Sequence, residues 1–401
     1  MKSGWITKRL GEVAKTQYGL SEPMNEDGKG FKIFRMGEVQ DGQLIDTGRM
    51  KFANISRVEF EKYRLRLGDV LFNRTNSFEL VGKTGIFALT GDYCFASYLV
   101  RLNLDRKAVL PEFLNYFMNS DVFQTSVKEK ASQSINQANI NATILSNELI
   151  RFPESLAEQR RIVGILDEAF EGIATAKANA EKNLQNAGAL FESHLQAVFT
   201  QRGDGWHDAQ LDDLTEPESP ITYGVVKPGD EGDIRFVRGG DLVRGKIRLD
   251  QLRTITRSVS DQYRRTLLRG GELLICLVGQ PGQVAVAPDE LSGANIARQV
   301  GLIRLKKSMN AEFVRYFLQS APGAEALGAR ESGSVQQVIN LGELRHLSVP
   351  FPQLDEQNDI VGKLDEAGAE TQRLESLYQR KLAALDELKK SLLHRAFSGQ
   401  L

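Results

Sequence analysis

The second half of this sequence repeats the first half. Gly68-Asp69-Val70-Leu71 in the first half matches Gly271-Glu272-Leu273-Leu274 in the second, and matching residues keep the same order throughout. An ordered series of this kind indicates that one structural unit has been duplicated, so each half must be able to form the same fold. Other matching pairs are Trp5 with Trp206, Arg35 with Arg238, Gly42 with Gly245, Phe113 with Phe313, Gln159 with Gln357 and Leu166 with Leu364.

Each half begins with a globular part. Residues 1–152 and 204–351 are punctuated by glycine, and they contain short apolar runs, such as Val70 to Phe72, that predict strands between turns. Residues 111–120 and 311–320 predict amphipathic helices whose aromatic side chains face a core. We therefore expect two similar α+β domains.

Each half ends with a long helix. Beyond Pro153 and Pro352, the segments 153–203 and 352–401 contain no further proline. Their apolar residues follow a four–three spacing, which creates an apolar seam that a lone helix cannot bury. Two such helices in one chain bury their seams most economically on each other, whereas a solitary helix would leave its seam in water. We expect an antiparallel coiled-coil spacer with a globular domain at each end and an approximate two-fold axis.

Composition excludes several classes of protein. The chain has 51 Lys and Arg and 52 Asp and Glu residues, and this balance excludes a uniformly basic DNA coat. Its two cysteines, Cys94 and Cys276, are too few for a disulfide scaffold or a four-cysteine zinc site, and we expect buried free thiols. The charged N-terminus is unlike a signal peptide, and the longest conspicuous apolar run, Leu273 to Val278, is far shorter than the ~20 residues of a membrane span. We expect a cytoplasmic protein without a membrane partner.

Positive charge is concentrated locally in each globular part. Residues 235–269 contain ten basic and three acidic residues, and residues 49–83 contain eight basic and four acidic residues. Such segments suit a phosphate backbone, because each cation can release a condensed counterion. The alternative is an ordinary solvated charged face, but its recurrence in both halves favours binding to double-stranded DNA.

Polar loops give a second indication of DNA binding. Asn73-Arg74-Thr75-Asn76 follows a predicted strand, and Ser132 to Gln137 recurs loosely as Ser332 to Gln337. Asn and Gln can pair bidentately with adenine and Arg with guanine, although the same residue types also favour ordinary turns. The candidate DNA-contacting residues are Arg49, Lys51, Arg74, Asn76, Lys83, Gln133, Asn136, Gln137, Arg238, Arg244, Lys246, Arg248, Gln280, Gln336 and Gln337.

No catalytic motif is found in the sequence. Gly82-Lys83-Thr84 resembles the end of a phosphate-binding loop, but Ser77 replaces the upstream glycine, so a turn between strands is the better interpretation. The Asn-Pro-Pro-aromatic signature of amino-methyltransferases is absent, and the four histidines lack metal-ligand spacing. We therefore expect no catalytic residues, no metal site and no cofactor in this chain.

The whole chain resembles a specificity subunit of a type I restriction-modification system. The resemblance rests on two globular parts that alternate with two long helices, and on several short motifs in both halves. The second half departs from the pattern at Asp212, where the first half has Gly11. The motifs are Trp5 through Leu10-Gly11-Glu12, the Phe-Pro entries into Glu158-Gln159 and Glu356-Gln357, the following Ile162 and Ile360, and the closing Ser391-Leu392-Leu393 and Ala396 to Leu401.

The resemblance implies a non-catalytic DNA reader with two target-recognition domains. In such a family each globular domain binds one half of a bipartite DNA site, and the helices set the gap and dock two modification subunits. Those subunits use S-adenosylmethionine, and restriction subunits, where present, add ATP- and Mg-dependent translocation and cleavage. Two other functions remain open, namely a duplicated protein–protein scaffold without sequence-specific DNA binding and a self-contained DNA-modifying enzyme.

Overall fold

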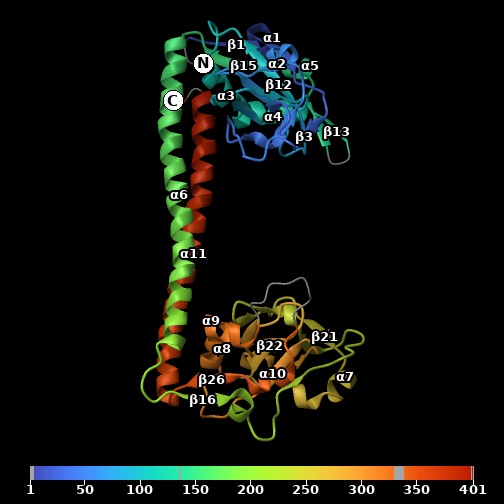
Figure 1. The fold of residues 1–401 in the computed structure, drawn as a ribbon, viewed down its shortest axis with the longest axis vertical. Coiled ribbons are helices and arrows are strands. Elements are labelled where there is room, and N and C mark those ends of the chain that lie inside the picture. The colour runs from blue at the N-terminus through green and yellow to red at the C-terminus, as the bar shows by residue number, and fades with distance from the viewer. Residues whose placement is uncertain (1–3, 135–136, 329–337, 399, 401) are drawn as a thin grey trace. The chain divides into compact units, whose positions relative to one another are not determined.

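The chain forms two compact units. The computed structural model describes residues 4–134, 137–328, 338–398 and 400. Unit 1 comprises Met1–Glu181 and Arg380–Leu401, and unit 2 comprises Lys182–Gln379. Each unit therefore contains one globular part and a piece of each long helix, and both chain ends belong to unit 1 (Figure 1).

Unit 1 has an α+β globular part. Its strands are β1 (Trp5–Arg9), β2 (Ala14–Tyr18), β3 (Met24–Asn25), β4 (Phe31–Phe34), β5 (Val39–Gln40), β6 (Gln43–Leu44), β7 (Lys51–Ala53), β8 (Val70–Asn73), β9 (Thr75–Asn76), β10 (Thr84–Ile86), β11 (Tyr93–Phe95), β12 (Leu99–Leu104), β13 (Ser132–Ser134), β14 (Gln137–Asn139) and β15 (Leu149–Pro153). Its short helices are α1 (Leu10–Val13), η1 (Met36–Glu38), α2 (Arg57–Tyr63), α3 (Pro111–Met118), α4 (Asp121–Glu129) and α5 (Ala142–Asn147). The strands form sheets of order β2-β12-β8-β10-β6-β5, β11-β4-β7-β3, β13-β14-β9 and β1-β15.

Unit 2 repeats this plan, with fewer strands among its described residues. Its strands are β16 (His207–Gln210), β17 (Thr222–Tyr223), β18 (Ile234–Val237), β19 (Leu242–Val243), β20 (Lys246–Ile247), β21 (Arg253–Ile255), β22 (Leu273–Cys276), β23 (Val284–Val286), β24 (Asn295–Ile296), β25 (Val300–Ile303) and β26 (Ser348–Phe351). Its short helices are η2 (Leu211–Leu214), η3 (Gly239–Asp241), α7 (Arg257–Asp261), η4 (Arg264–Thr266), η5 (Asp289–Leu291), α8 (Ala311–Gln319), α9 (Ala321–Ala326) and α10 (Leu341–His346). The sheet orders are β17-β25-β22-β23, β21-β18-β24, β19-β20 and β16-β26, so β25-β22-β23 corresponds to β12-β8-β10 of unit 1.

The two long helices form where the sequence predicts them. They are α6 (Leu156–Thr200) and α11 (Leu354–Ser398), and they run antiparallel inside each unit. In unit 1, Lys177 of α6 donates a 2.5 Å hydrogen bond to Asp386 of α11. In unit 2, a Cβ added at Gly368 of α11 would lie 3.5 Å from the ring of Phe191 of α6. The seam therefore admits glycine and aromatic residues as well as aliphatic ones.

One phenylalanine at the end of each long helix enters the core of a globular part. In unit 1, the ring centroid of Phe397 of α11 lies 5.3 Å from that of Phe113 and 5.4 Å from that of Phe117, both of α3. In unit 2, Phe199 of α6 lies 5.3 Å and 5.5 Å from two phenylalanines of α8. These edge-on and tilted arrangements suit aromatic rings, and they confirm that α3 and α8 face the core.

A buried glutamine joins each globular part to the helix that follows it. The amide oxygen of Gln159 accepts a 2.8 Å hydrogen bond from the Leu110 backbone N–H, and its amide nitrogen donates to the Ala108 and Pro153 carbonyls at 2.9 and 2.8 Å. Gln357 makes the corresponding bonds in unit 2, with Asn310 as donor and Pro352 as one acceptor. Both glutamines are fully buried, so their partners depend on them. This explains why a glutamine recurs at the start of both predicted helices.

A tyrosine–aspartate pair makes a second repeated joint. The Tyr116 hydroxyl donates to Asp167 of α6 at 2.5 Å, and the Tyr316 hydroxyl donates to Asp365 of α11 at 2.6 Å. Burial, followed by the hydrogen bond to the carboxylate, raises the pKa of both phenols, that of Tyr316 to about 12. Both hydroxyls therefore remain protonated donors at neutral pH.

An arginine–carboxylate pair holds the loop before the central strand of each globular part. Arg101 of β12 donates to the Arg64 and Lys62 carbonyls at 2.7 and 3.0 Å and pairs with Asp69 at 3.2 Å. In unit 2, Arg304 donates to the carbonyls of the matching residues, Arg265 and Leu267, and pairs with Glu272. Both guanidinium groups are largely buried, so these contacts stabilise the repeated fold and leave little of either arginine for a ligand.

Candidate nucleic-acid interface

In unit 1, the structure brings the two predicted polar loops together. Strand β14 pairs antiparallel with β9, so that Ala138 lies opposite Asn76 and Asn139 lies opposite Thr75. Strand β13 adds to the other edge of β14 and completes a small three-stranded sheet. The sequence placed these segments in two separate loops, and pairing across 60 residues of chain is not visible from local pattern.

Arg74 is held beside this small sheet by several contacts. Its guanidinium lies 5.0 Å from the ring centroid of Tyr18, and it donates 3.3 Å hydrogen bonds to the Ser97 carbonyl and to the Asn139 side chain. Asn139 is itself fixed by a 2.7 Å hydrogen bond to Thr75. The Nε of Arg74 is buried and has no hydrogen-bond partner among the described residues. Arg74 is therefore preoriented on an aromatic ring, an arrangement that is compatible with packing and also with the predicted contact to a base edge.

The other candidates of this sheet are polar and accessible. Asn76 is half-buried, and its side-chain oxygen accepts a 2.9 Å hydrogen bond from the Ser77 N–H, which leaves the amide N–H groups for other partners. Gln133 and Gln137 are exposed, while Asn136 lies outside the described residues. The structure thus places Asn76, Gln133 and Gln137 on one small sheet and Arg74 directly before its strand β9.

Three exposed aromatic side chains occur near Arg74. Tyr18 is 44% exposed, and Phe78 and Tyr98, which lie near Arg74 along the chain or through its backbone contacts, are also exposed. Aromatic rings on a polar, cationic surface can contact the sugar or base faces of a nucleic acid. Sequence reasoning missed these residues, because an exposed tyrosine cannot be distinguished from a core tyrosine without its burial.

Two lysines lie close together next to this loop. The Lys128 ammonium donates a 2.8 Å hydrogen bond to the Glu79 carbonyl, and its pKa is lowered by burial and then by the positive charge of Lys83. Lys83 was predicted from the sequence, whereas Lys128 of α4 was not.

Arg49 and Lys51 belong to a different part of unit 1. Lys51 lies on β7 in the four-stranded sheet, and its ammonium is 2.9 Å from Glu26, whose pKa it lowers. Arg49 is exposed just before the same strand. The predicted basic residues of unit 1 therefore belong to different elements of its fold, with Lys51 in one sheet and Arg74 beside another.

Some arginines of the arginine-rich segment of unit 2 bind carboxylate and carbonyl groups of the same unit and so stabilise its local structure. Arg238 pairs with the buried carboxylate of Asp241 at 2.9 Å, as Arg35 pairs with Glu38 at 2.8 Å in unit 1. The hydrogen bond to Asp241 raises the pKa of Arg238. Arg248 donates to the Gly240 carbonyl at 2.8 Å.

Arg244 and Lys246 lie at a tight hairpin between β19 and β20. Arg244 has φ 50° and Gly245 has φ 81°, and in unit 1 Asp41 and Gly42 have φ 49° and 82°. Positive φ at both central residues is typical of the type I′ hairpin turn. Arg244 is an exposed cation at the tip of that turn, whereas unit 1 has an acidic residue at the same place.

Gln280 follows β22 at the position that corresponds to the loop after β8. Val278 forms an antiparallel bridge with Val338, as Thr75 and Asn76 pair with β14 in unit 1. Gln280 is exposed in the next turn. Gln336 and Gln337 precede Val338 and lie outside the described residues.

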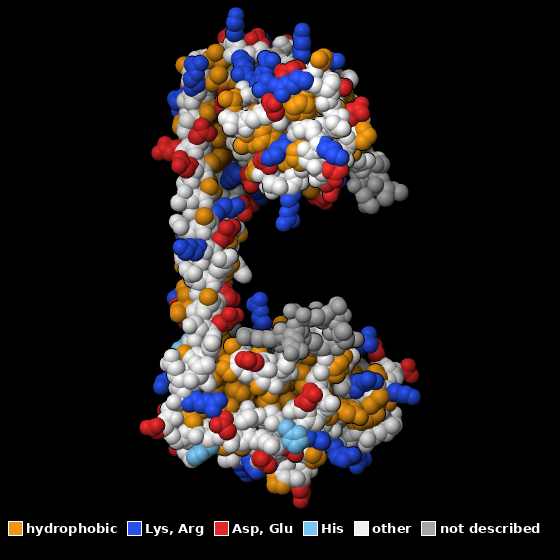
Figure 2. Space-filling view, viewed as in Figure 1, with side chains coloured by type: hydrophobic (Ala, Val, Ile, Leu, Met, Phe, Trp, Pro, Cys, Tyr) orange, Lys and Arg blue, Asp and Glu red, His pale blue; other side chains and the backbone are white. Residues whose placement is uncertain are grey.

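The charges on each unit are interspersed. Figure 2 shows Lys and Arg side chains mixed with acidic and hydrophobic ones on the visible face of each unit. Within the described ranges, no group of three or more His, Cys, Asp or Glu residues could hold a metal ion, and no helix is long and apolar enough to cross a membrane. Both cysteines are buried and free, as predicted.

Comparison with known proteins places the chain in a family. The family model of the type I restriction modification DNA specificity domain matches residues 2–185 and 203–381. The specificity subunit of the type I restriction enzyme EcoBI from Escherichia coli is 26% identical over 67% of this chain, and that match spans 62% of the EcoBI subunit. The putative MjaX specificity subunit of Methanocaldococcus jannaschii is 23% identical over 99% of this chain and 93% of its own length.

Solved structures show the same fold. A chain from a study of complex assembly and conformational transition of the type I R-M system has a TM-score of 0.75 at 20% identity, over 100% of this chain and 99% of its own. The HsdS subunit from Thermoanaerobacter tengcongensis has a TM-score of 0.60 at 19% identity, over 100% and 98%. The duplicated α+β fold predicted from the sequence is therefore confirmed, and the chain belongs to the family of type I restriction modification DNA specificity domains.

Proposed function

We propose that this chain is the DNA-sequence-specificity subunit of a type I restriction-modification complex, and that each unit binds one half of a bipartite DNA site. The proposal rests on a contrast within the repeat. The residues that hold the fold recur, such as Gln159 with Gln357 and Tyr116 with Tyr316. The loop after the central strand differs, because Asn73 to Asn76 in unit 1 corresponds to Cys276 to Gly279 in unit 2.

This contrast is what two independent readers require. A common framework places the same loop at the same edge of a sheet, and different side chains on that loop select different bases. A duplicated scaffold that only bound protein partners in the same way would need no such divergence in the loop. Salt dependence separates the two functions, because DNA binding through phosphates weakens steeply as salt increases.

We further propose that α6 and α11 set the gap between the half-sites and dock two modification subunits. In this proposal the chain is not itself an enzyme, and S-adenosylmethionine, ATP and Mg are used by modification and restriction subunits in the cytoplasm. The apolar seam and the buried glutamines support a stiff connection between each globular part and its helix.

The test is methylome sequencing of cells that produce this chain with its modification subunits. We expect one bipartite methylated motif. Exchanging residues 204–351 for the matching part of a relative should change one half of the motif and leave the other half intact. If both halves change together, or if no motif depends on this chain, the proposal is wrong.

A further inference from the structure

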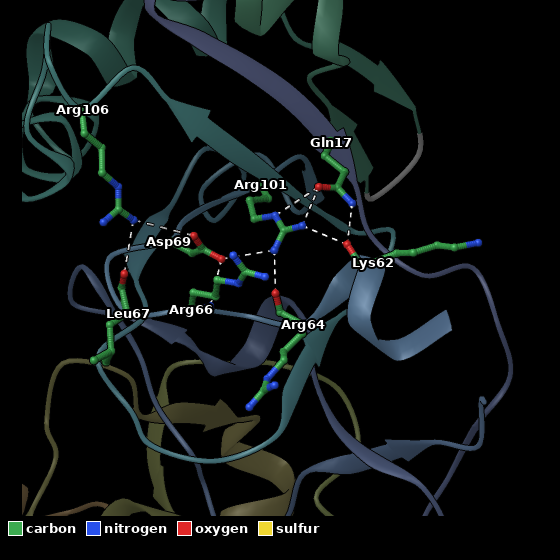
Figure 3. A network of polar contacts seen from close by, with 8 residues as sticks. All are labelled: Gln17, Lys62, Arg64, Arg66, Leu67, Asp69, Arg101 and Arg106. Carbon is green, nitrogen blue, oxygen red and sulfur yellow. Dashed lines mark hydrogen bonds and ion pairs between the residues drawn. The ribbon is translucent and has the colours of Figure 1, made fainter. Parts of the chain in front are cut away.

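A basic hollow in unit 1 lies apart from Arg74 and the small sheet β13-β14-β9, since none of their residues line it. Its volume is about 560 Å³, and its lining includes Arg64, Arg66, Arg101 and Arg106 together with Glu61 and Asp69. Figure 3 shows Asp69 between Arg101 and Arg106, with Arg64 and Arg66 beside them. Four guanidinium groups and two carboxylates leave a surplus of positive charge.

The carboxylates are already occupied. Asp69 accepts from the Arg66 backbone N–H at 3.0 Å and pairs with Arg101 at 3.2 Å. Glu61 lies 3.1 Å from Arg57 and 3.4 Å from Arg64, and Arg64 also reaches Asp92 at 3.1 Å. These contacts hold several of the side chains that line the hollow in place, but they do not neutralise every arginine among them.

Two arginines at the rim remain available. The Arg66 guanidinium is exposed and makes no hydrogen bond or ion pair with the described residues. Arg106 donates to the Leu67 carbonyl at 3.2 Å and is 4.0 Å from Asp69, and its side chain is more than half exposed. A Cβ at Gly68, which has φ +80°, would come 3.2 Å from this guanidinium, so the turn gives Arg106 room that a larger residue would take.

Unit 2 supplies an internal comparison. Arg269 corresponds to Arg66 along the repeat, and its backbone N–H likewise donates to the carboxylate of Glu272 at 2.7 Å. The Arg269 guanidinium, however, lies 3.5 Å from Glu216. The matching cation is thus neutralised in unit 2 and left unneutralised in unit 1.

We propose that this hollow binds a phosphate group through Arg66 and Arg106. Planar guanidinium groups suit phosphate oxygens because they can donate two parallel hydrogen bonds. Asp69 and Arg74 bound strand β8, and five steps of extended chain span about 17 Å, or about five base-pair steps of a duplex. The separation of the two places is thus within the length of one duplex. A backbone phosphate as the ligand rests on the proposed function, whereas binding of a free phosphate does not.

The experiment compares the double variant Arg66→Ala/Arg106→Ala with Arg269→Ala as the matched control. Affinity for duplexes with and without the methylated motif is measured across a range of salt concentrations, with the full chain and its modification subunits. If the phosphate belongs to DNA, affinity for both duplexes should fall by roughly tenfold per lost contact at about 0.1 M salt, and the salt slope should fall by about one per contact. The methylated motif should not change.

A second measurement uses the full chain without DNA. If the hollow takes a free phosphate, inorganic pyrophosphate should raise the melting temperature of the parent chain and the control but not that of the double variant. The proposal is overturned if the double variant matches the control in both measurements. It is also overturned if the double variant loses only affinity for the modification subunits, because the hollow would then bind a carboxylate of a protein partner. If the parent complex binds no DNA, the proposed function fails, and the pyrophosphate result decides the hollow by itself.

Discussion

Replacing the buried Gln159 by leucine should destabilise unit 1. The change keeps the size of the side chain but removes one acceptor and both donors, so the Pro153 carbonyl is left buried without a partner, and the Leu110 N–H and Ala108 carbonyl are left partly buried. A fully buried unsatisfied group costs about 1–3 kcal/mol, and a partly buried one costs less because water can reach it. We therefore expect a loss of about 2–4 kcal/mol in the free energy of unfolding of unit 1.

The two tryptophans allow each unit to be followed separately. Trp5 lies 6.1 Å from Phe113 in unit 1, and Trp206 lies 5.8 Å from Phe313 in unit 2. In a Trp206→Phe background, the fluorescence of the chain reports on unit 1. With a urea dependence of about 2 kcal/mol per molar, the midpoint of the Trp5 transition should fall by about 1–2 M.

Two variants control this experiment. Asn179 is an exposed amide on the part of α6 that belongs to unit 1, so Asn179→Leu should leave the Trp5 midpoint nearly unchanged. Gln357→Leu in a Trp5→Phe background should destabilise unit 2 somewhat less, because the bond from Gln357 to the Ser308 carbonyl is 3.4 Å long. If Gln159→Leu shifts the Trp5 midpoint no more than Asn179→Leu does, the buried amide does not join the globular part to its helix, and our reasoning is refuted.

Three further predictions concern recognition, thiol chemistry and the helices. Arg74→Ala should relax the base preference at one position of one half-site and weaken DNA binding by about 1–3 kcal/mol. A large fall in melting temperature at unchanged DNA affinity would instead show that Arg74 acts in packing. Burial raises the pKa of the Cys94 thiol to about 12, whereas a thiol in the unfolded chain has a pKa near 8.5, so the fold should lose stability as pH rises between these two values. Cys94→Ala should reduce that loss in urea titrations. An unchanged pH dependence of stability would contradict this prediction. Inserting four residues at Ala178 lengthens α6 by about 6 Å, so the methylated motif should keep its half-sites and change the gap between them. The same insertion at Gly203, beyond the helix, should not change the gap. An unchanged gap in an active Ala178 variant would mean that the length of α6 does not set the gap.

The sequence predicted those parts of the fold that have a long or repeated pattern. The four–three spacing located α6 and α11 to within a few residues, and the aromatic spacing located α3 and α8, because an amphipathic helix records its buried face along the chain. The small sheet β13-β14-β9 could not be predicted, because its strands have two or three residues and their pairing depends on contacts distant in sequence. A three-residue strand has too few alternations to reveal which side is buried.

Buried polar side chains were the second class that the sequence could not assign. Arg101 and Gln159 are residue types that are usually exposed, and nothing nearby in the chain indicates the carbonyls that they bind. The pair Arg238 and Asp241 is different, because its three-residue spacing at the start of a short helix is a local capping signal. That signal would have separated Arg238 from the exposed Arg244 before the structure was known.

The pattern of repeated and divergent residues selects candidate DNA-contacting residues more sharply than the distribution of charge does. Arg35, Arg101 and their counterparts carry charge in both units, yet their partners are carboxylates and backbone carbonyls of the same unit. Charge that recurs at matching positions therefore mostly maintains the common framework. Tyr18 and Tyr223, which are 44% and 49% exposed, recur at corresponding places on β2 and β17. Arg74 lies over the ring of Tyr18 and has no counterpart in unit 2, where the matching residue is the buried Leu277. At this place, a residue that differs between the two units therefore lies beside an aromatic residue that both units have.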